Sequence, residues 1–316
     1  MSKTENIFKR LQEYDKKAKV VKLFNPNESR TEFGCPPRLC LNTYVGCRSQ
    51  CAYCYNHYIK GFDSPHEKYS FENYIRKDIK RIFEFELQDL VVSISNSTDP
   101  LQEPLESRHG HTLFALHELN KHGLKVLILT KNPSMLLNSE YFEQINNENV
   151  ALQVSIAFIN NRFEPGAPLV EDRLKAVAEL KKKGLKNLAI RLDPLVSPEI
   201  GGQTDQELEE LIKRIKDVGV DHVISKVFRL VGAIGRRYKL FFEEAKRHYV
   251  KVGAKWNKNH YMLQIEKKKQ LLERVWGICQ REGLTLSVCY EKVVFPGVFK
   301  CDLTENKLGV CWRQNN

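Results

Sequence analysis

The chain has 316 residues, of which 50 are Lys or Arg and 39 are Asp or Glu, giving a formal net charge of +11. A hydrophobic fraction of 42% and a charged fraction of 28% exclude a disordered chain and indicate one large domain or two small ones. No run of about 18 uncharged apolar residues and no secretory leader appears, so we expect a cytoplasmic protein without a membrane segment. The nine cysteines are an odd number, which suggests metal binding or thiol chemistry rather than a disulfide framework.

Short apolar runs alternate with amphipathic segments along most of the chain, and this rhythm predicts strands and helices in turn. We predict strands over residues 41–45, 90–94, 125–129, 151–157, 187–192 and 222–227. We predict the intervening helices over residues 71–86, 107–122, 138–147, 171–184 and 205–218. Six strands with five helices between them indicate successive βαβ units and a parallel sheet. The pattern alone does not separate a doubly wound sheet from a whole or partial barrel.

The two ends of the chain do not follow this rhythm. Residues 1–34 are polar and lack a clean period, which predicts a loosely packed N-terminal arm. After residue 227, helices are predicted over residues 236–249 and 260–282. A cysteine-bearing tail with short apolar runs at 284–289 and 293–299 follows them. We therefore divide the chain into an arm (1–34), a core (35–230) and a basic, helical and cysteine-containing C-terminal extension (231–316).

Three cysteines lie close together just beyond the first predicted strand. Cys47, Cys51 and Cys54 are separated by three and two residues, so one irregular loop can wrap a compact metal centre. Soft thiolates favour iron–sulfur clusters, zinc or Cu(I). Three thiolates are one fewer than a closed zinc site or a cubane cluster takes from protein, so a 4Fe-4S cluster bound here keeps one iron open. The alternatives are a zinc site completed by His57 and reduced cysteines of the core.

The arrangement Cys-x3-Cys-x-Tyr-Cys, with Tyr53 before the last cysteine, resembles that of the radical S-adenosylmethionine (SAM) enzymes. The resemblance points to the branch of spore photoproduct lyase and its uncharacterised relatives. Further motifs that carry it lie at residues 93–106, 129–132, 154–156, 164–168 with Arg173, and 191–198. It implies a partial, six-stranded, TIM-like (β/α) barrel, with SAM chelating the open iron of a 4Fe-4S cluster on Cys47, Cys51 and Cys54.

Polar residues follow several predicted strands at their carboxyl ends, where barrels and open parallel sheets bind ligands. Ser95, Asn96, Ser97 and Asp99 come after the second strand. We expect them to bind the amino group and ribose of SAM, with Asp99 accepting from the ammonium. The alternative for Asp99 is an Asx turn or a helix N-cap.

Later strand ends carry further candidates. The resemblance implies that Lys131 holds the carboxylate of SAM, and the alternative is a surface lysine. Ser155 is expected to face the ribose, and the alternative is a satisfied core hydroxyl. Arg191 and Asp193 are interpreted as contacts to cofactor or substrate, or as partners of each other. Glu164 and Arg173 are interpreted as a structural ion pair.

One position departs from the pattern of spore photoproduct lyase. The resemblance places a hydrogen-donating cysteine three residues before Asp99, and Asn96 stands there instead. A carboxamide cannot donate a hydrogen atom to a carbon radical as a thiol can. We therefore expect a substrate different from that of strict spore photoproduct lyases.

Six cysteines remain outside the triplet. Cys35 and Cys40 precede it, and the tail carries Cys279, Cys289, Cys301 and Cys311. The four tail cysteines are candidate ligands of a second iron–sulfur cluster or of zinc, although they lack paired Cys-x2-Cys spacing. The alternatives are buried free thiols and a thiol that supplies the hydrogen atom that Asn96 cannot.

The positive charge is concentrated in one window. Residues 236–269 hold eleven Lys or Arg against three Glu, a net charge of +8. Six aromatic residues are interleaved with them: Tyr238, Phe241, Phe242, Tyr249, Trp256 and Tyr261. Cations can bind phosphates while aromatic rings stack on bases, which suggests a nucleic-acid substrate. The alternative is a pair of amphipathic helices whose aromatic residues pack on the barrel.

Together these features predict a radical SAM enzyme of lyase or transferase type. We expect it to cleave SAM reductively to a 5′-deoxyadenosyl radical that abstracts hydrogen from a substrate, with nucleic-acid lesion repair as one reaction of this kind. Modification of a peptide or a small molecule is the alternative within this class. The alternative from another class is a non-catalytic, zinc-stabilised nucleic-acid-binding protein. The enzyme would need an electron donor of the ferredoxin or flavodoxin type, and the sequence does not indicate an oligomeric state.

Overall fold

The computed structural model describes residues 3–24, 38–59, 61–146, 148–257, 259–289, 291, 293 and 295–297. Its main sheet has eight strands in the order β1-β2-β5-β6-β7-β8-β9-β13. Their bounds are β1 (Val21–Leu23), β2 (Leu39–Leu41), β5 (Val92–Ile94), β6 (Val126–Thr130), β7 (Val150–Ser155), β8 (Leu188–Leu195), β9 (His222–Val227) and β13 (Thr285–Val288). All neighbouring strands from β2 to β13 pair in parallel, and β1 pairs with β2 antiparallel.

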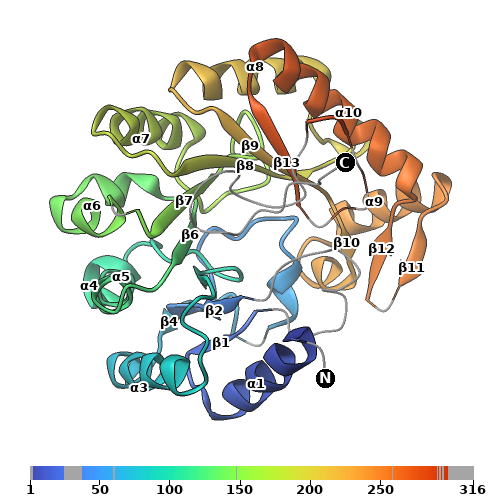
Figure 1. The fold of residues 1–316 in the computed structure, drawn as a ribbon. Coiled ribbons are helices and arrows are strands. Elements are labelled where there is room, and N and C mark those ends of the chain that lie inside the picture. Colours follow the sequence, from blue (N-terminus) through green and yellow to red (C-terminus); the bar gives the residue numbers. More distant parts are fainter. Residues whose placement is uncertain are drawn as a thin grey trace.

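The sheet curves without closing, because β1 and β13 are its two edges. Figure 1 shows helices around the outside of the curve. These helices are α3 (Phe71–Glu84), α4 (Leu105–His109), α5 (His111–Lys121), α6 (Ser139–Ile145), α7 (Val170–Lys182), α8 (Asp205–Asp217) and α10 (Ile265–Glu282). A curved, open parallel sheet covered by helices is a partial (β/α) barrel. The predicted α/β fold is confirmed.

Side chains alternate between the two faces of each strand, as the period of two requires. On β6, Val126 and Ile128 belong to the large core beneath the helices, whereas Leu127 faces the inside of the curve. There it joins a small apolar cluster with Val91, Ala151, Ala189 and Ile224. The concave side is thus packed with apolar side chains in this layer.

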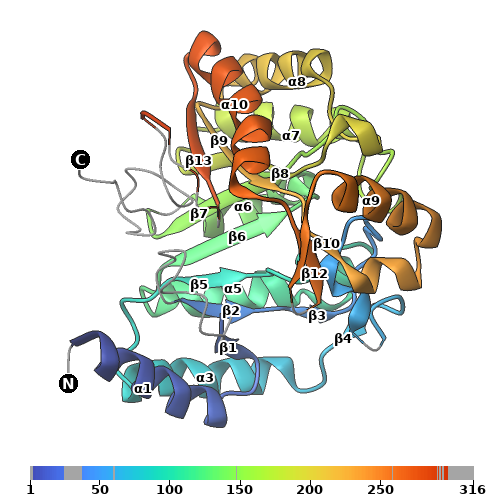
Figure 2. The ribbon, with the colours of Figure 1, turned by 90° about the vertical axis from the view of Figure 1, so that its right-hand side faces the viewer.

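Smaller elements lie at the end of the barrel to which the strands point. Figure 2 shows β10, β12 and α9 on this side of the molecule. β10 and β12 belong to a three-stranded sheet with the order β10-β12-β11, and α9 is a helix beside this sheet. The bounds are β3 (Tyr44–Val45), β4 (His66–Glu67), β10 (Leu230–Val231), α9 (Lys239–Lys251), β11 (Lys255–Asn257) and β12 (His260–Met262).

Two predictions about the chain ends were wrong. The described part of the N-terminal arm is not loosely packed, because it forms helix α1 (Lys3–Lys17) and strand β1, and Leu11 and Tyr14 are fully buried. The segment 260–282 is not one helix, since β12 precedes α10. The tail run 284–289 forms β13, which extends the sheet by pairing with β9. One core cluster contains residues from Leu11 to Phe295, and the division into three parts stays a prediction.

No helix among the described residues has the length and hydropathy needed to cross a membrane.

Candidate cofactor site

The three cysteines of the triplet lie in an irregular loop between β3 and the short 3-10 helix η1 (Tyr55–Tyr58). Cys47 and Cys51 are buried and Cys54 is half-buried. Burial raises the pKa of the Cys51 thiol, Lys131 opposes this shift, and Glu164 and the sulfur atoms of Cys54 and Cys47 raise the pKa further. The three sulfur atoms are therefore close enough to interact with one another.

The triplet suggests two kinds of metal centre, a single metal ion and a 4Fe-4S cluster, which need different arrangements of ligands. Among the described residues, no three side chains of His, Cys, Asp or Glu converge closely enough to hold a single metal ion. A 4Fe-4S cluster has a different requirement, because each thiolate binds its own iron. Three thiols on one irregular loop supply one thiolate to each of three irons, so this set of donors fits such a cluster.

The zinc alternative receives no support at His57. Its Nε2 atom lies 2.9 Å from the carbonyl oxygen of Cys51, so it faces the backbone. The imidazole also packs against the rings of Phe62 and Tyr238, with centroids 5.4 and 5.5 Å away. The other ring nitrogen, Nδ1, lies 3.9 Å from the Asp63 carboxylate, and no three His, Cys, Asp or Glu side chains in the described part of the chain converge on one ion.

The segment after β5 holds the cysteine loop in place. The buried side chain of Gln102 accepts a hydrogen bond from the Arg48 N–H at 3.0 Å and donates one to the Gly46 carbonyl at 3.1 Å. Farther along the loop, the Asn56 amide donates to the Ser97 carbonyl at 2.8 Å. Sequence reasoning missed Gln102, because its contacts join residues more than fifty positions apart and follow no period.

The four candidates after β5 have different surroundings. Ser95 is 1% exposed and adopts φ +60°, and its Oγ has no partner among the described residues. The Asn96 carbonyl accepts from the Tyr55 hydroxyl at 2.7 Å, and the Ser97 N–H donates to the Asn42 side chain at 3.1 Å. An unpartnered buried hydroxyl beside the cysteine loop is compatible with a ligand there.

Asp99 binds the chain itself. Its carboxylate accepts the N–H of Leu101 at 3.0 Å, which forms the alternative Asx turn. It also accepts the Thr130 hydroxyl at 2.8 Å and the Lys131 N–H at 2.7 Å. Asp99 thereby ties the turn after β5 to the end of β6, and its contact with a cofactor ammonium stays a prediction.

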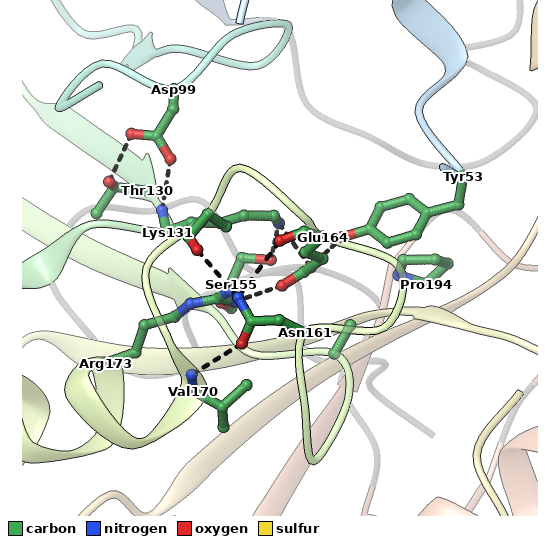
Figure 3. Close-up of polar contacts among 12 residues, drawn as sticks. Tyr53, Asp99, Thr130, Lys131, Ser155, Asn161, Glu164, Val170, Arg173 and Pro194 are labelled. Carbon is green, nitrogen blue, oxygen red and sulfur yellow. Dashed lines mark hydrogen bonds and ion pairs between the residues drawn. The ribbon is translucent and has the colours of Figure 1, made fainter. Parts of the chain in front are cut away.

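Lys131 lies in a polar cluster with residues of β7, the following loop and α7 (Figure 3). Its ammonium donates to Ser155 Oγ at 2.6 Å and lies 3.3 Å from Glu164 Oε1. Glu164 also accepts the Tyr53 hydroxyl and forms an ion pair with Arg173 at 2.6 Å. The structure thus brings together Tyr53, Lys131 and Ser155, and it confirms the Glu164–Arg173 ion pair.

The charges in this cluster set the protonation states. Burial lowers the pKa of Lys131, but the Glu164 carboxylate and the Cys51 thiol outweigh it, so the net shift is upward. Burial raises the pKa of Glu164, but Lys131 and Arg173 outweigh it, so the net shift is downward. At neutral pH Lys131 is therefore cationic and Glu164 anionic.

Arg191 and Asp193 form an ion pair at 2.6 Å on β8, as the pairing alternative predicted. Arg191 also donates to the Gln153 side chain at 3.0 Å. Burial raises the pKa of Asp193, but Arg191 and Lys226 outweigh it and the net shift is downward. The register of the two strands places Arg191 beside Ser155 of the cluster around Lys131, and Lys131 also lowers the pKa of Asp193.

The remaining cysteines lie apart from the triplet. Cys279 is fully buried in α10, and burial raises the pKa of its thiol to about 12. Cys289 is half-buried and packs beside the small inner cluster. Cys35, Cys301 and Cys311 lie outside the described residues, so a second metal site in the tail stays a prediction.

Most aromatic residues of the basic window pack onto the protein. Phe241 contacts the rings of Phe163 and Phe228, and Tyr249 is buried with its hydroxyl on the Phe228 carbonyl. Trp256 on β11 is 50% exposed and is the one aromatic side chain of this window with a largely open face. The packing alternative therefore accounts for five of the six aromatic residues, and Trp256 remains available for stacking.

Known proteins are similar to this chain in sequence. The Radical SAM superfamily matches residues 41–215, more than half of the chain. The uncharacterized protein ORF301 of Acidianus two-tailed virus is 27% identical over 59% of this chain and 66% of its own length. An uncharacterized protein of Methanocaldococcus jannaschii is 24% identical over 49% of this chain and 60% of its own length. The chain therefore matches less than two thirds of each of these relatives.

Solved structures share the fold. A variant of spore photoproduct lyase with bound SAM (AdoMet) and dinucleoside spore photoproduct aligns with a TM-score of 0.61 and 17% identity, covering 78% of this chain and 75% of that one. SuiB of Streptococcus suis bound to its precursor peptide SuiA aligns with a TM-score of 0.55 and 15% identity, covering 82% of this chain and 51% of that one. At these identities the likeness concerns the fold.

Proposed function

Because the chain belongs to the radical SAM superfamily, we propose that it binds a 4Fe-4S cluster through Cys47, Cys51 and Cys54 and uses SAM to start a radical reaction. The observation that carries this proposal is the loop of three neighbouring thiols, in which Cys51 also interacts with the cationic Lys131. When bound and reduced, the cluster supplies the electron that cleaves SAM to a 5′-deoxyadenosyl radical, which abstracts hydrogen from a substrate.

The chain's own residues supply binding and orientation. Lys131 stays protonated at neutral pH, so its ammonium is suited to bind the carboxylate of SAM. Ser155 accepts a hydrogen bond from that ammonium and fixes its direction. Asp99 holds the backbone at Lys131, and Ser95 offers a hydroxyl without a partner among the described residues.

The barrel also restricts water. The small apolar cluster of Leu127, Ala151, Ala189 and its neighbours fills one layer of the concave side. A radical reaction needs such a barrier, because water and stray hydrogen donors would divert a reactive intermediate. Gln153 and Arg191 follow Ala151 and Ala189 on the same face of β7 and β8, and we place the substrate beyond them.

The substrate we favour is a nucleic acid. The window 236–269 carries a net charge of +8, and Trp256 exposes half of its surface beside Lys255. Cations that neutralise phosphates and an open aromatic ring that stacks on a base are the two requirements of single-strand binding. Modification of a peptide or small molecule is the alternative, and the basic window is then only a solvated surface.

The reaction needs one electron at a time from outside the chain. We assign this role to a soluble electron-transfer protein of the ferredoxin or flavodoxin type, because a cluster held by the triplet would have to be reduced before it could cleave SAM. Chemical reduction by dithionite replaces this partner in the tests below.

The deciding experiment is anaerobic reconstitution followed by assays for iron and 5′-deoxyadenosine. We expect a brown protein with about four irons per chain that releases 5′-deoxyadenosine from SAM after reduction. Cys47→Ala, Cys51→Ala and Cys54→Ala should each lose the colour and the product. A colourless protein that binds zinc would overturn the proposal.

Nucleic-acid binding is tested separately by mobility shifts with single-stranded and duplex DNA and RNA at several salt concentrations. We expect binding that weakens steeply as salt rises. If no binding is seen at low salt, the proposal of a nucleic-acid substrate is overturned. The proposal of a SAM-dependent radical reaction does not depend on this result.

A further inference from the structure

Glu164 is a fully buried carboxylate in the loop between β7 and α7, and it meets polar groups from three different parts of the chain. The Tyr53 hydroxyl of the cysteine loop donates to it, the ammonium of Lys131 at the end of β6 lies 3.3 Å away, and Arg173 of α7 pairs with it at 2.6 Å. Figure 3 shows these side chains directed toward the one carboxylate.

The loop that carries Glu164 is itself fixed. The side-chain amide of Asn161 donates to the carbonyls of Ala167 and Pro168, both at 3.0 Å, and its carbonyl oxygen accepts the Val170 N–H at 3.1 Å. These bonds close the loop onto the start of α7. Glu164 therefore sits on a rigid support rather than on an adaptable loop.

The same loop is bonded directly to the cysteine loop. The Ala52 N–H donates to the Phe163 carbonyl at 2.9 Å, and the Gly166 N–H donates to the Ser49 carbonyl at 3.1 Å. Because these two backbone bonds flank Glu164 in sequence, any shift of the cysteine loop would also move the carboxylate. The hydrogen bond from the Tyr53 hydroxyl to Glu164 adds a side-chain link between the same two loops.

The charge arrangement explains why a carboxylate is needed here. Lys131 and Arg173 are both cations in a buried region, and burying two like charges without an anion would be strongly unfavourable. Arg173 is oriented by the carbonyls of Pro168 and Ser155, at 2.9 and 3.0 Å. Glu164 is thus shared by two cations, and its carboxylate only partly neutralises Lys131, which keeps attraction for a second anionic group.

We infer that Glu164 is the positioning residue of the cofactor site. It sets where the ammonium of Lys131 lies and links it, through Tyr53, to the loop of Cys47, Cys51 and Cys54. The position of a carboxylate bound to Lys131 is then fixed relative to the thiolates of the cysteine loop. This inference rests on the proposed function, since Lys131 is the residue expected to bind the carboxylate of SAM.

The test is SAM binding to the anaerobically reconstituted, oxidised full chain, measured by titration calorimetry without turnover. Glu164→Gln keeps the shape of the side chain and removes its charge, and we expect it to weaken SAM binding by about tenfold or more at unchanged iron content. Glu171→Gln is the matched control, because Glu171 is exposed and pairs only with Arg214 at the surface. An unchanged dissociation constant in a folded Glu164→Gln protein would overturn the inference.

Iron content and thermal unfolding separate positioning from a loss of general stability. We expect Glu164→Gln to match the unaltered protein in both measurements while its affinity for SAM falls. A SAM affinity that falls only in step with the iron content would overturn the inference.

Tyr53→Phe is the second variant, used alongside Glu164→Gln and decisive if that protein fails to fold. It keeps the aromatic ring and removes the hydroxyl that donates to Glu164. We expect a smaller loss of SAM affinity, about threefold to tenfold, at unchanged iron content, and an unchanged affinity would overturn the link to the cysteine loop. If the unaltered protein itself fails to bind SAM, the proposed function fails instead.

Discussion

The side-chain amide of Asn96 donates a hydrogen bond to the thiol of Cys40 across 3.1 Å. Cys40 lies on β2, beside Ser93 of β5, and is 9% exposed. The amide of Asn42 reaches the same sulfur at 3.8 Å. At the position where the sequence resemblance implies a cysteine, the chain thus has an amide that contacts a thiol on the neighbouring strand.

This setting predicts an unreactive, protonated thiol at Cys40. Burial raises its pKa, and the hydrogen bond from Asn96 offsets only part of that shift. Thiolates, not thiols, react with alkylating agents, so iodoacetamide should label Cys40 at pH 7.5 at least about tenfold more slowly in the folded than in the denatured protein. Labelling should accelerate as the pH rises beyond the ordinary thiol range. Peptide mass spectrometry gives the rate at each cysteine, and labelling at the rate of a free thiol would contradict the burial of Cys40.

Gly166 should tolerate no side chain. A Cβ atom there would lie 1.9 Å from the carbonyl oxygen of Arg48, which is backbone and cannot turn aside. Gly166→Ala should therefore push the two loops apart and destabilise the protein by about 1–3 kcal/mol, together with a loss of bound iron. The control is Gly277→Ala within α10, where a methyl group meets only the end of the Arg281 side chain at 3.8 Å.

Gly277→Ala should instead stabilise the protein by about 0.5–1 kcal/mol, because Ala loses less backbone entropy than Gly in a helix. Thermal unfolding of both variants, with iron measured before and after, gives the comparison. Equal stability of Gly166→Ala and the unaltered protein would show that the two loops are not held together as described.

Asp78 on α3 should be the main anchor of the N-terminal segment. Its fully buried carboxylate accepts the N–H groups of Lys19, Val20 and Val21 at 2.7–3.1 Å. Asp78→Asn removes one acceptor oxygen and the charge, and leaves buried donors unsatisfied, so we expect a loss of about 2–4 kcal/mol. Limited proteolysis should then cut the chain before residue 24 sooner than in Asp217→Asn, a control on the exposed end of α8. Equal cutting would contradict the anchoring role.

The contrast between β6 and β13 shows what the sequence can predict about this fold. β6 lies between two amphipathic helices and has an unbroken apolar run, so its period is sufficient to identify it. β13 comes after α9 and the small sheet, where the alternation of strands and helices is interrupted. Its short apolar run in the cysteine-bearing tail has no feature that distinguishes a barrel strand from other apolar runs of the chain. Only its pairing with β9 makes it part of the barrel, and that pairing joins segments about sixty residues apart.

The cofactor site shows the same limit. The spacing of Cys47, Cys51 and Cys54 is local and identifies the loop directly. Glu164 and Arg173 were identified as an ion pair, but the convergence of Tyr53 and Lys131 on the same carboxylate joins three loops and follows no sequence period. Buried polar networks of this kind depend on tertiary geometry, which composition and spacing do not record.

Trp256 should carry much of any binding to single-stranded nucleic acid. Its indole is half exposed and is supported edge-on by Tyr261, with centroids 4.8 Å apart. Stacking of one base contributes about 1–3 kcal/mol, so Trp256→Ala should weaken the binding of a short oligothymidylate about fivefold to 150-fold at fixed salt. Leu240→Ala on α9 is the control, because Leu240 is 87% exposed and has no aromatic ring. Equal affinity of Trp256→Ala and the unaltered protein would place the contact elsewhere.

His111 should make the stability of the protein depend on pH. Its ring stacks between Tyr44 and Phe71, with centroids 5.4 and 4.5 Å away, and neither ring nitrogen has a hydrogen-bond partner among the described residues. Burial lowers the pKa of His111, the nearby Glu106 opposes this shift, and the net direction is downward. The folded protein therefore binds the proton less readily than the unfolded chain does.

As pH falls through about 6.5, the unfolded chain takes up this proton first, so the free energy of unfolding decreases. The decrease from one such group is at most about 1.4 kcal/mol per pH unit. His111→Phe keeps the stacked ring and removes the titration, so its stability should fall less between pH 7 and about pH 5. Urea unfolding of both proteins at each pH measures the difference, and their comparison at pH 8 isolates the effect of the substitution itself. Parallel pH profiles would mean that the imidazole is protonated equally in the folded and unfolded states, against the burial that surrounds it.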